Sequence, residues 1–160
     1  MIKVEEIAEK YKGYEVDEEK LKEFLTPPTP KTVWNLKNSD RYWSISSYAD
    51  VYNKTWKNVV VDNWRRNIGN CFLTKEDAEF EVMRRKVETT LLKCGRREFK
   101  NKDYNFYIVY DHDESLVGIL NDTFRQYSNT IYFDTKELCQ KAIIAAGEEN
   151  IKKYIFGVKV

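Results

Sequence analysis

The chain has 160 residues, of which 14% are aromatic, and disordered chains are poor in aromatic residues, so disorder is excluded for most of the length. Its 27 Lys and Arg against 26 Asp and Glu give a net charge of +1, which attracts nucleic acid only weakly. The first residues contain no hydrophobic signal core, and no apolar run approaches the length of a membrane helix. We therefore expect a cytoplasmic protein with no membrane partner.

The start of the chain predicts a helical appendage. Residues 1–26 place apolar residues at helical spacing before Gly13, and Asp17 can cap a second short helix, which together predict a helical hairpin. The proline-rich segment 27–32 predicts an extended linker, because proline fixes φ and removes a backbone donor. The remainder, 33–160, is expected to form one α+β domain.

The first unit of this domain, 33–95, begins with aromatic strands. Segment 40–46 alternates in polarity and predicts a strand, and the polar residues 47–50 predict a turn. The β-prone runs 51–56 and 59–64 predict the next one or two strands.

A helix is expected to complete the first unit. Thr74 can cap its start, and Asp77 stands at the spacing of a capping box, so the helix should run over 75–94. Its buried stripe follows from steps of three or four residues: Phe80, Met83, Val87, Leu91 and Cys94.

The second unit, 103–160, repeats this plan. Strands are expected over 104–110, 116–120 and 130–133, followed by a helix over 136–146 that Gly147 ends, with a short further helical segment after it. The expected cap is Asp134 or Thr135, and the expected buried stripe is Leu138, Cys139, Ala142, Ile143 and Ala146.

These elements predict an α+β fold, in which an N-terminal helical hairpin precedes two antiparallel β-meander-plus-helix units. Both units contain Phe-x-Thr-Lys-Glu, at 72–76 and at 133–137, an offset of 61 residues. An internal repeat explains this match, and so does the local chemistry of two similar strand-to-helix junctions. Both explanations stay open at this point.

The block 69–79 reads Gly-Asn-Cys-Phe-Leu-Thr-Lys-Glu-Asp-Ala-Glu. An aromatic hairpin, a Trp and an Arg pair precede it, and the tail 147–154, Gly-Glu-Glu-Asn-Ile-Lys-Lys-Tyr, closes the pattern. In these parts the chain over 33–157 resembles a family of small uncharacterised phage and prophage proteins of Firmicutes, whose block is Gly-Asn-x-Phe-x-Thr-x-Glu-x-Ala-Glu. Asp77 stands where a second Glu is usual. The resemblance implies a phage origin and a bacterial host cytoplasm, and it implies no particular activity.

No catalytic, cofactor or metal constellation stands out in the sequence. The single histidine, His112, lies in an acidic run that predicts a solvated turn. Leu116 stands where a calcium loop needs glycine, and no Cys or His pair has zinc spacing. The three cysteines are far apart and predict free thiols. We therefore expect a protein that is not an enzyme and needs no cofactor.

The first candidate site combines aromatic and arginine side chains, which stack on bases and dominate protein interfaces. Because 59–64 predicts a strand, Arg65 and Arg66 are expected on opposite faces, one facing a ligand and the other structural. The alternative is that many of these aromatic side chains form the β core. The candidates are Trp64, Arg65, Arg66, Tyr42, Trp43 and Trp56.

The second candidate site is basic. Residues 84–102 contain eight Lys and Arg against two Glu, which favours a nucleic-acid patch or simply a solvated helix end. Its candidate residues are Arg84, Arg85, Lys86, Lys93, Arg96 and Arg97.

Two hypotheses of function follow. The first is a non-enzymatic, phage-encoded counter-defence protein that sequesters a nucleotide signal, or blocks a host defence effector such as a CRISPR nuclease, by stoichiometric binding. The alternative is a nucleic-acid-binding accessory protein of phage replication or regulation. Self-association is left open by the sequence.

Overall fold

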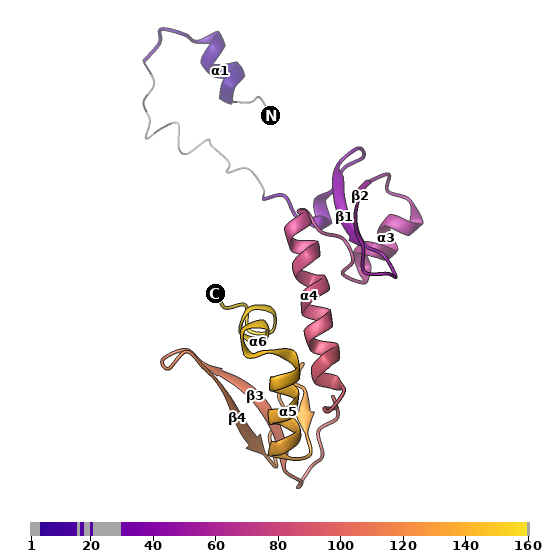
Figure 1. The fold of residues 1–160 in the computed structure, drawn as a ribbon. Helices are drawn as coiled ribbons and strands as arrows, with labels where there is room; N and C mark the ends of the chain where they lie inside the picture. The colour runs from indigo at the N-terminus through magenta and orange to yellow at the C-terminus, as the bar shows by residue number, and fades with distance from the viewer. Residues whose placement is uncertain (1–3, 16, 18–19, 21–29, 160) are drawn as a thin grey trace. The chain divides into compact units, whose positions relative to one another are not determined.

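The computed structural model describes residues 4–15, 17, 20 and 30–159, and it divides into two compact units, Met1–Lys31 and Thr32–Val160. In the first unit, helix α1 spans Val4–Lys10 and confirms the first helix of the predicted hairpin (Figure 1). Acidic residues in its first turn and a lysine in its last suit the helix dipole. The predicted second helix and most of the proline-rich linker lie outside the described residues.

The second unit begins with a 3-10 turn, η1 (Val33–Asn35), and an antiparallel hairpin of β1 (Arg41–Ile45) and β2 (Val51–Thr55). The predicted strands and turn are confirmed here. In the turn, the Ser46 hydroxyl accepts hydrogen bonds from the backbone N–H groups of Tyr48 and Asp50. On the other side of β1, Trp43 forms an isolated antiparallel bridge with Phe72.

The prediction of a strand over 59–64 was wrong, because this segment forms helix α3 (Val60–Asn67). The consecutive valines favour a strand by propensity, but tertiary contacts decide the outcome. The Asp62 carboxylate accepts a hydrogen bond from the backbone N–H of Lys57, at 2.9 Å, and this bond stabilises the first turn.

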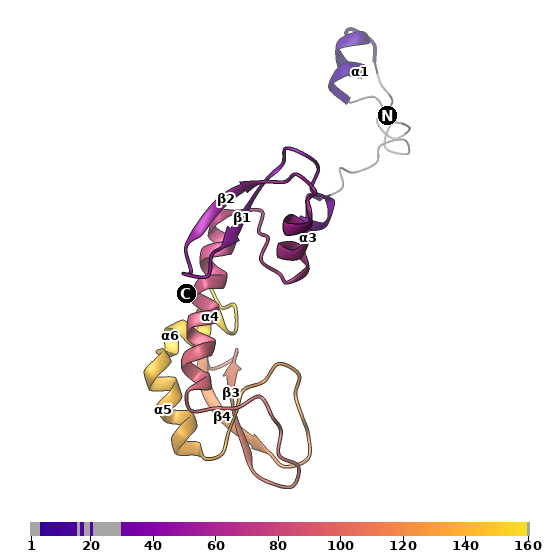
Figure 2. The same ribbon diagram turned by 90° about the vertical axis from the view of Figure 1, so that its right-hand side faces the viewer.

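Helix α4 (Lys75–Leu92) is the element shared by both halves of the second unit (Figures 1 and 2). The Thr74 hydroxyl accepts from the Asp77 N–H at 3.1 Å, as the sequence predicts. The buried stripe is Ala78, Val82, Val87 and Leu91. It coincides with the predicted stripe at Val87 and Leu91. The predicted Phe80 and Met83 are not among the buried residues of the helix, and the predicted Cys94 lies beyond its end.

The other half contains strands β3 (Asn105–Asp111), β4 (Leu116–Asp122) and β5 (Tyr132–Phe133), then helices α5 (Lys136–Ala146) and α6 (Glu148–Tyr154). The antiparallel sheet has the order β4-β3-β5, so β5 pairs with β3, and the strands do not form the predicted meander. The α+β class and the helix positions are confirmed. One core cluster holds α4, α5 and this sheet together: Val87, Leu91, Phe133, Cys139, Ala142, Ile143, Ala146 and Ile151.

Both halves place a short segment against the free side of their first strand. Phe72 pairs with Trp43 of β1, and Phe133 pairs with Phe106 of β3. In each half a threonine two residues later caps the next helix, since the Thr135 hydroxyl accepts from the Leu138 N–H at 3.2 Å. The halves therefore share a topology, and an ancestral repeat stays a prediction.

Two general features accompany this fold. The three cysteines are free thiols, and burial raises the pKa of Cys71 to about 11 and that of Cys139 to about 12.

Within the described ranges, none of the helices is both long enough and apolar enough to cross a bilayer.

Gly69 ends α3 in the left-handed conformation, with φ +71°, and its N–H donates to the Arg66 carbonyl. Asn70 follows and pairs with β1, because its amide side chain bonds both the N–H and the carbonyl of Ile45, each at 2.8 Å. A Cβ on Gly69 would meet nothing within 4 Å, so the cost of a side chain there is backbone strain alone.

We predict that Gly69→Ala lowers the free energy of unfolding by about 1–2 kcal/mol, because L-residues are strained in the left-handed region. Gly69→Val should cost at least as much, and Gly69→Asn less, because asparagine tolerates this conformation better. Thermal unfolding followed by circular dichroism measures the effect as a lower Tm. An unchanged Tm for Gly69→Val would show that the turn imposes no such constraint.

Candidate functional site

Helix α3 buries a charged face. Asp62 is only 4% exposed, and its carboxylate accepts a 2.7 Å hydrogen bond from the Tyr42 hydroxyl of β1 in addition to the bond from Lys57. The Arg65 guanidinium lies 3.7 Å from the same carboxylate and donates to the Tyr42 hydroxyl at 3.2 Å. Asp62, Tyr42 and Arg65 form what we call the Asp62 cluster, which joins α3 to the hairpin.

The electrostatics of the Asp62 cluster keep it charged at neutral pH. Burial alone would raise the pKa of Asp62, but the hydrogen bonds from Lys57 and Tyr42 and the nearby Arg65 hold it below its ordinary 3.8. Burial, together with the hydrogen bond to Asp62, raises the pKa of Tyr42 to about 12. The tyrosine therefore remains a donor to an ionised carboxylate.

Arg66 also points inward, between two indole rings. Its guanidinium carbon lies 5.1 Å from the Trp34 ring centroid and 4.9 Å from that of Trp56, and one N–H donates to the Asn63 amide oxygen at 2.7 Å. Its buried Nε–H has no hydrogen-bond partner in the part of the chain that the structure describes. The aromatic faces are therefore the main support for this cation.

The opposite face of α3 is apolar and exposed. Val60, Trp64 and Ile68 follow each other at i, i+4 spacing, so their side chains lie in one row. Together with Val61 they form what we call the α3 outer face. Val60 is 61% exposed, Val61 45%, Trp64 64% and Ile68 72%. A helix normally buries its apolar stripe and exposes its charges, and α3 does the reverse.

The structure separates the predicted aromatic–arginine site into different environments. Tyr42 and Trp56 are core residues, and Trp43 is half-buried against α4 with Phe72. The expected placement of Arg65 and Arg66 on opposite faces was wrong, because a helix, not a strand, carries them. Both face inward, Arg65 toward Tyr42 and Arg66 between the rings of Trp34 and Trp56. Of the six candidates, Trp64 is the one whose ring is mostly exposed.

The sequence prediction missed three contributors to the site, namely Asp62, Trp34 and the aliphatic part of the α3 outer face. The available signal was the i, i+4, i+8 spacing of Val60, Trp64 and Ile68, with charged residues between them. Nothing in the sequence alone indicates that the charged side of this helix would be the buried one.

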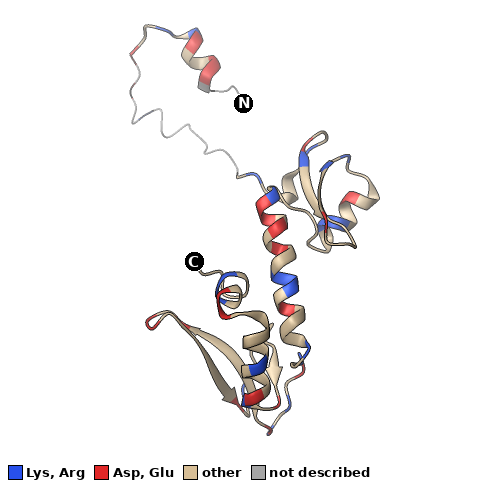
Figure 3. Cartoon of the chain, viewed as in Figure 1, with Lys and Arg blue, Asp and Glu red and all other residues tan. Residues whose placement is uncertain are grey.

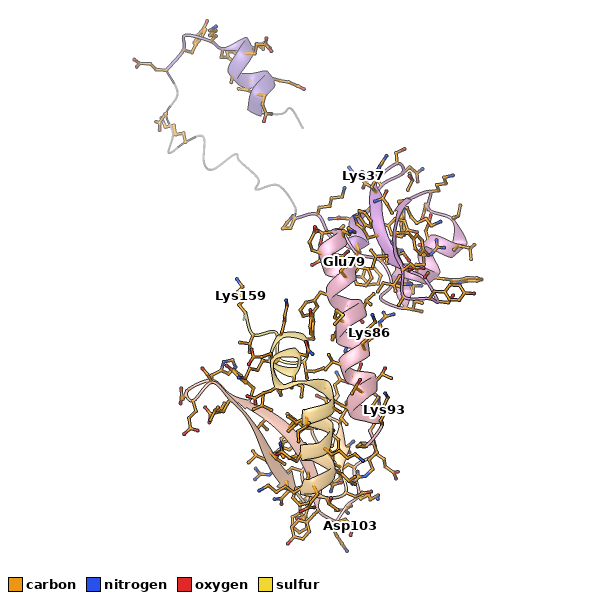
Figure 4. All side chains as sticks on the ribbon, viewed as in Figure 1. Lys37, Glu79, Lys86, Lys93, Asp103 and Lys159 are labelled. Carbon is orange, nitrogen blue, oxygen red and sulfur yellow. The ribbon has the colours of Figure 1, made fainter. Side chains whose placement is uncertain are left out.

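The predicted basic patch is largely neutralised by ion pairs. Arg84 and Arg85 both pair with Glu81, Arg84 and Arg97 pair with Glu88, and Arg96 pairs with Asp134. Figure 3 shows that acidic and basic residues are interleaved along α4. Lys86 and Lys93, labelled in Figure 4, are exposed and line a shallow hollow beside the β1–β2 turn.

His112 lies in the exposed turn between β3 and β4, with its ring 4.8 Å from that of Tyr110. Among the residues that the structure describes, no group of three or more His, Cys, Asp or Glu side chains could hold a metal ion.

Comparisons with protein-family models, with curated proteins and with solved structures found no match to this chain.

We predict that Asp62→Ala lowers the free energy of unfolding by about 3 kcal/mol at pH 7, because it leaves Arg65 facing a buried site without its counter-charge. The isosteric Asp62→Asn tests the charge alone. Because the pKa of Asp62 is lowered on folding, the stability from its charge is present above about pH 4 and is lost as pH falls through the lowered value.

Urea unfolding of the wild type and of Asp62→Asn between pH 7 and pH 2.5 measures this dependence. The stability difference between them should narrow as the pH falls below 4. Asp50→Asn, in the exposed hairpin turn, is the matched control and should give a small difference at every pH. A constant difference for Asp62→Asn would mean that its ionisation does not support the fold.

Proposed function

We propose that this chain is a non-catalytic binding protein that captures another protein through the α3 outer face. The observation that supports this most is the inverted polarity of α3, which exposes Trp64 and three aliphatic side chains while Asp62, Arg65 and Arg66 face inward. Tryptophan surrounded by aliphatic residues is typical of interface hot spots, which lose water completely on binding. A helix laid in a partner's groove uses this same i, i+4 row of anchors.

The charge of the segment that contains α3 defines the partner further. Residues 32–74 contain no Glu, and their basic side chains exceed their acidic ones. We infer that the partner presents an apolar groove with an acidic rim, because complementary charge steers association and fixes orientation. Apart from the inward-facing Asp62, Arg65 and Arg66, the charged side chains of this segment are the basic Lys37, Arg41, Lys54 and Lys57 and the acidic Asp40 and Asp50.

The other partners considered from the sequence have less support. The α3 outer face has no Lys or Arg, and most arginines of the 84–97 patch already have carboxylate partners, so few cations are available for phosphates. Tyr42 and Trp56 are buried, and Arg65 and Arg66 are engaged, so they do not offer an open ring and fork to a nucleotide. A protein target is therefore the better proposal.

The resemblance to phage proteins suggests where the partner is found, namely in the cytoplasm of a bacterial host infected by a phage. In that setting the target is a component of a bacterial host defence system in the cytoplasm, blocked by stoichiometric binding. This step rests on the sequence pattern of the block 69–79 and the tail 147–154.

The test compares Trp64→Ser with Tyr48→Ser, a second exposed aromatic that lies in the β1–β2 turn. The wild type is used to capture its target from a host lysate, and the identified target is then purified and titrated calorimetrically against each folded variant. Trp64→Ser should weaken binding roughly 30-fold or more, as loss of a hot-spot residue does, and Tyr48→Ser should bind like the wild type.

Salt dependence gives an independent readout. Binding through the α3 outer face should weaken only modestly between 50 and 200 mM salt, as expected for charges at the rim of an apolar contact. Binding through 6–10 phosphate contacts instead falls by about 10³–10⁵ over this range. Full binding by Trp64→Ser, or a steep loss with salt, would contradict the proposal.

A further inference from the structure

A hollow lies in the other half of the second unit, away from α3. It measures about 600 Å³, which falls within the range of roughly 300–1,000 Å³ typical of small-molecule sites. Helix α4, strand β3, the loop before β5 and the segment after α6 all contribute to its lining. Its apolar walls include Leu91, Ile108, Ile131, Tyr154 and Phe156.

The aromatic walls of this hollow are held in place from behind. The Tyr154 ring lies 5.1 Å from Phe80, and the Phe156 ring lies 5.9 Å from Tyr110. The loop at the rim is fixed as well, because the Tyr132 hydroxyl accepts from the Tyr127 N–H at 2.6 Å and donates to the Tyr127 carbonyl at 3.1 Å. Because these side chains and this loop are already held in place, little conformational entropy is lost when a ligand binds.

The polar side of the hollow is formed by Arg84, Glu88 and Arg97. Glu88 uses both carboxylate oxygens, at 3.1 Å from Arg84 and 2.6 Å from Arg97. Arg84 is also held by two bonds to Glu81, so each of its three nitrogens donates to a carboxylate. These two arginines and Glu88 leave one net positive charge on the lining.

Arg97 has more N–H groups available to a ligand than Arg84 does. A guanidinium has five N–H groups, and in the described part of the chain Arg97 makes one hydrogen bond, to Glu88. Its side chain is 55% exposed, so the free side of the fork is accessible from the hollow's opening. A carboxylate, sulfonate or phosphate fits this fork better than a neutral group does.

We propose that this hollow binds a small organic anion, with a flat ring system against Tyr154 and Phe156 and a single anionic group on Arg97. The rings and aliphatic side chains favour a flat apolar body by area and stacking. The single net positive charge favours one anionic group over two. A second anionic group on the ligand would lie near the Glu88 carboxylate and be repelled by it, so the site favours a ligand with one anionic group.

The experiment uses probes with one ring system and opposite charges, 1-naphthoate and 1-naphthylmethylammonium. Each is titrated into the ¹⁵N-labelled full chain, and amide shifts are followed by NMR. Naphthoate should saturate and shift the amides of Arg97, Thr130, Ile131 and Phe156, and the ammonium probe should bind at least tenfold more weakly. Equal binding of the two probes, shifts elsewhere, or no shifts at millimolar naphthoate would overturn the proposal.

Variants assign the effect to the hollow. Arg97→Gln should weaken naphthoate binding roughly tenfold, as expected for loss of a charge-assisted hydrogen bond. Arg85→Gln is the matched control, because Arg85 is also half-exposed and pairs with one glutamate, at 2.7 Å, yet does not line this hollow. Naphthoate binding that is equally weak, or equally strong, in both variants would overturn the role of Arg97.

A third variant tests the apolar part. Ile155→Trp enlarges an exposed lining residue and should abolish naphthoate binding while the amide spectrum of the remaining fold is retained. Undiminished binding by folded Ile155→Trp would contradict the proposed site. Trp64→Ser should leave naphthoate binding unchanged, because the hollow and the α3 outer face are independent.

Discussion

The buried carboxylate of Asp62 is the constraint on which the first half of the second unit depends. It joins three segments, because it accepts from Tyr42 of β1 and from the Lys57 N–H before α3, while Arg65 balances its charge. A buried charge is tolerated only with such partners, so the polar side of α3 must face the hairpin. The exposed apolar face is the geometric consequence, and the protein-binding role proposed here follows from it.

Helix α4 connects this half to the other, and its side chains serve both. Ala78 and Val82 pack with Ile45 of the hairpin, and Val87 and Leu91 belong to the second core. Its arginines pair with Glu81 and Glu88 along the same helix, and Glu88 also pairs with Arg97 beyond the helix end. These ion pairs leave little free charge on a segment whose sequence is rich in Lys and Arg. One helix therefore separates two candidate surfaces, the α3 outer face and the hollow beside Arg97.

Local chemistry made much of the fold predictable. Thr74 and Thr135 cap helices as expected, and Gly69 adopts the positive φ that its position between an aromatic segment and a strand-to-helix junction suggests.

The helical state of 60–67 was not predictable from its valines, because the deciding contacts come from Tyr42, far away in sequence. The pairing of β5 with β3 also depends on long-range contacts. Trp64, one of the sequence candidates, is exposed, whereas Tyr42 and Trp56 are buried and could not be told from surface aromatics without their tertiary neighbours.

The most direct test of the inverted helix is hydroxyl-radical footprinting of the free protein, with the oxidation rate of each tryptophan measured by mass spectrometry. Trp34 and Trp56 are internal standards, since they are 66% and 2% exposed. Trp64, at 64% exposure, should be oxidised as fast as Trp34 and far faster than Trp56. If Trp64 is instead protected as well as Trp56, α3 buries its apolar face in solution, and the proposed binding surface does not exist.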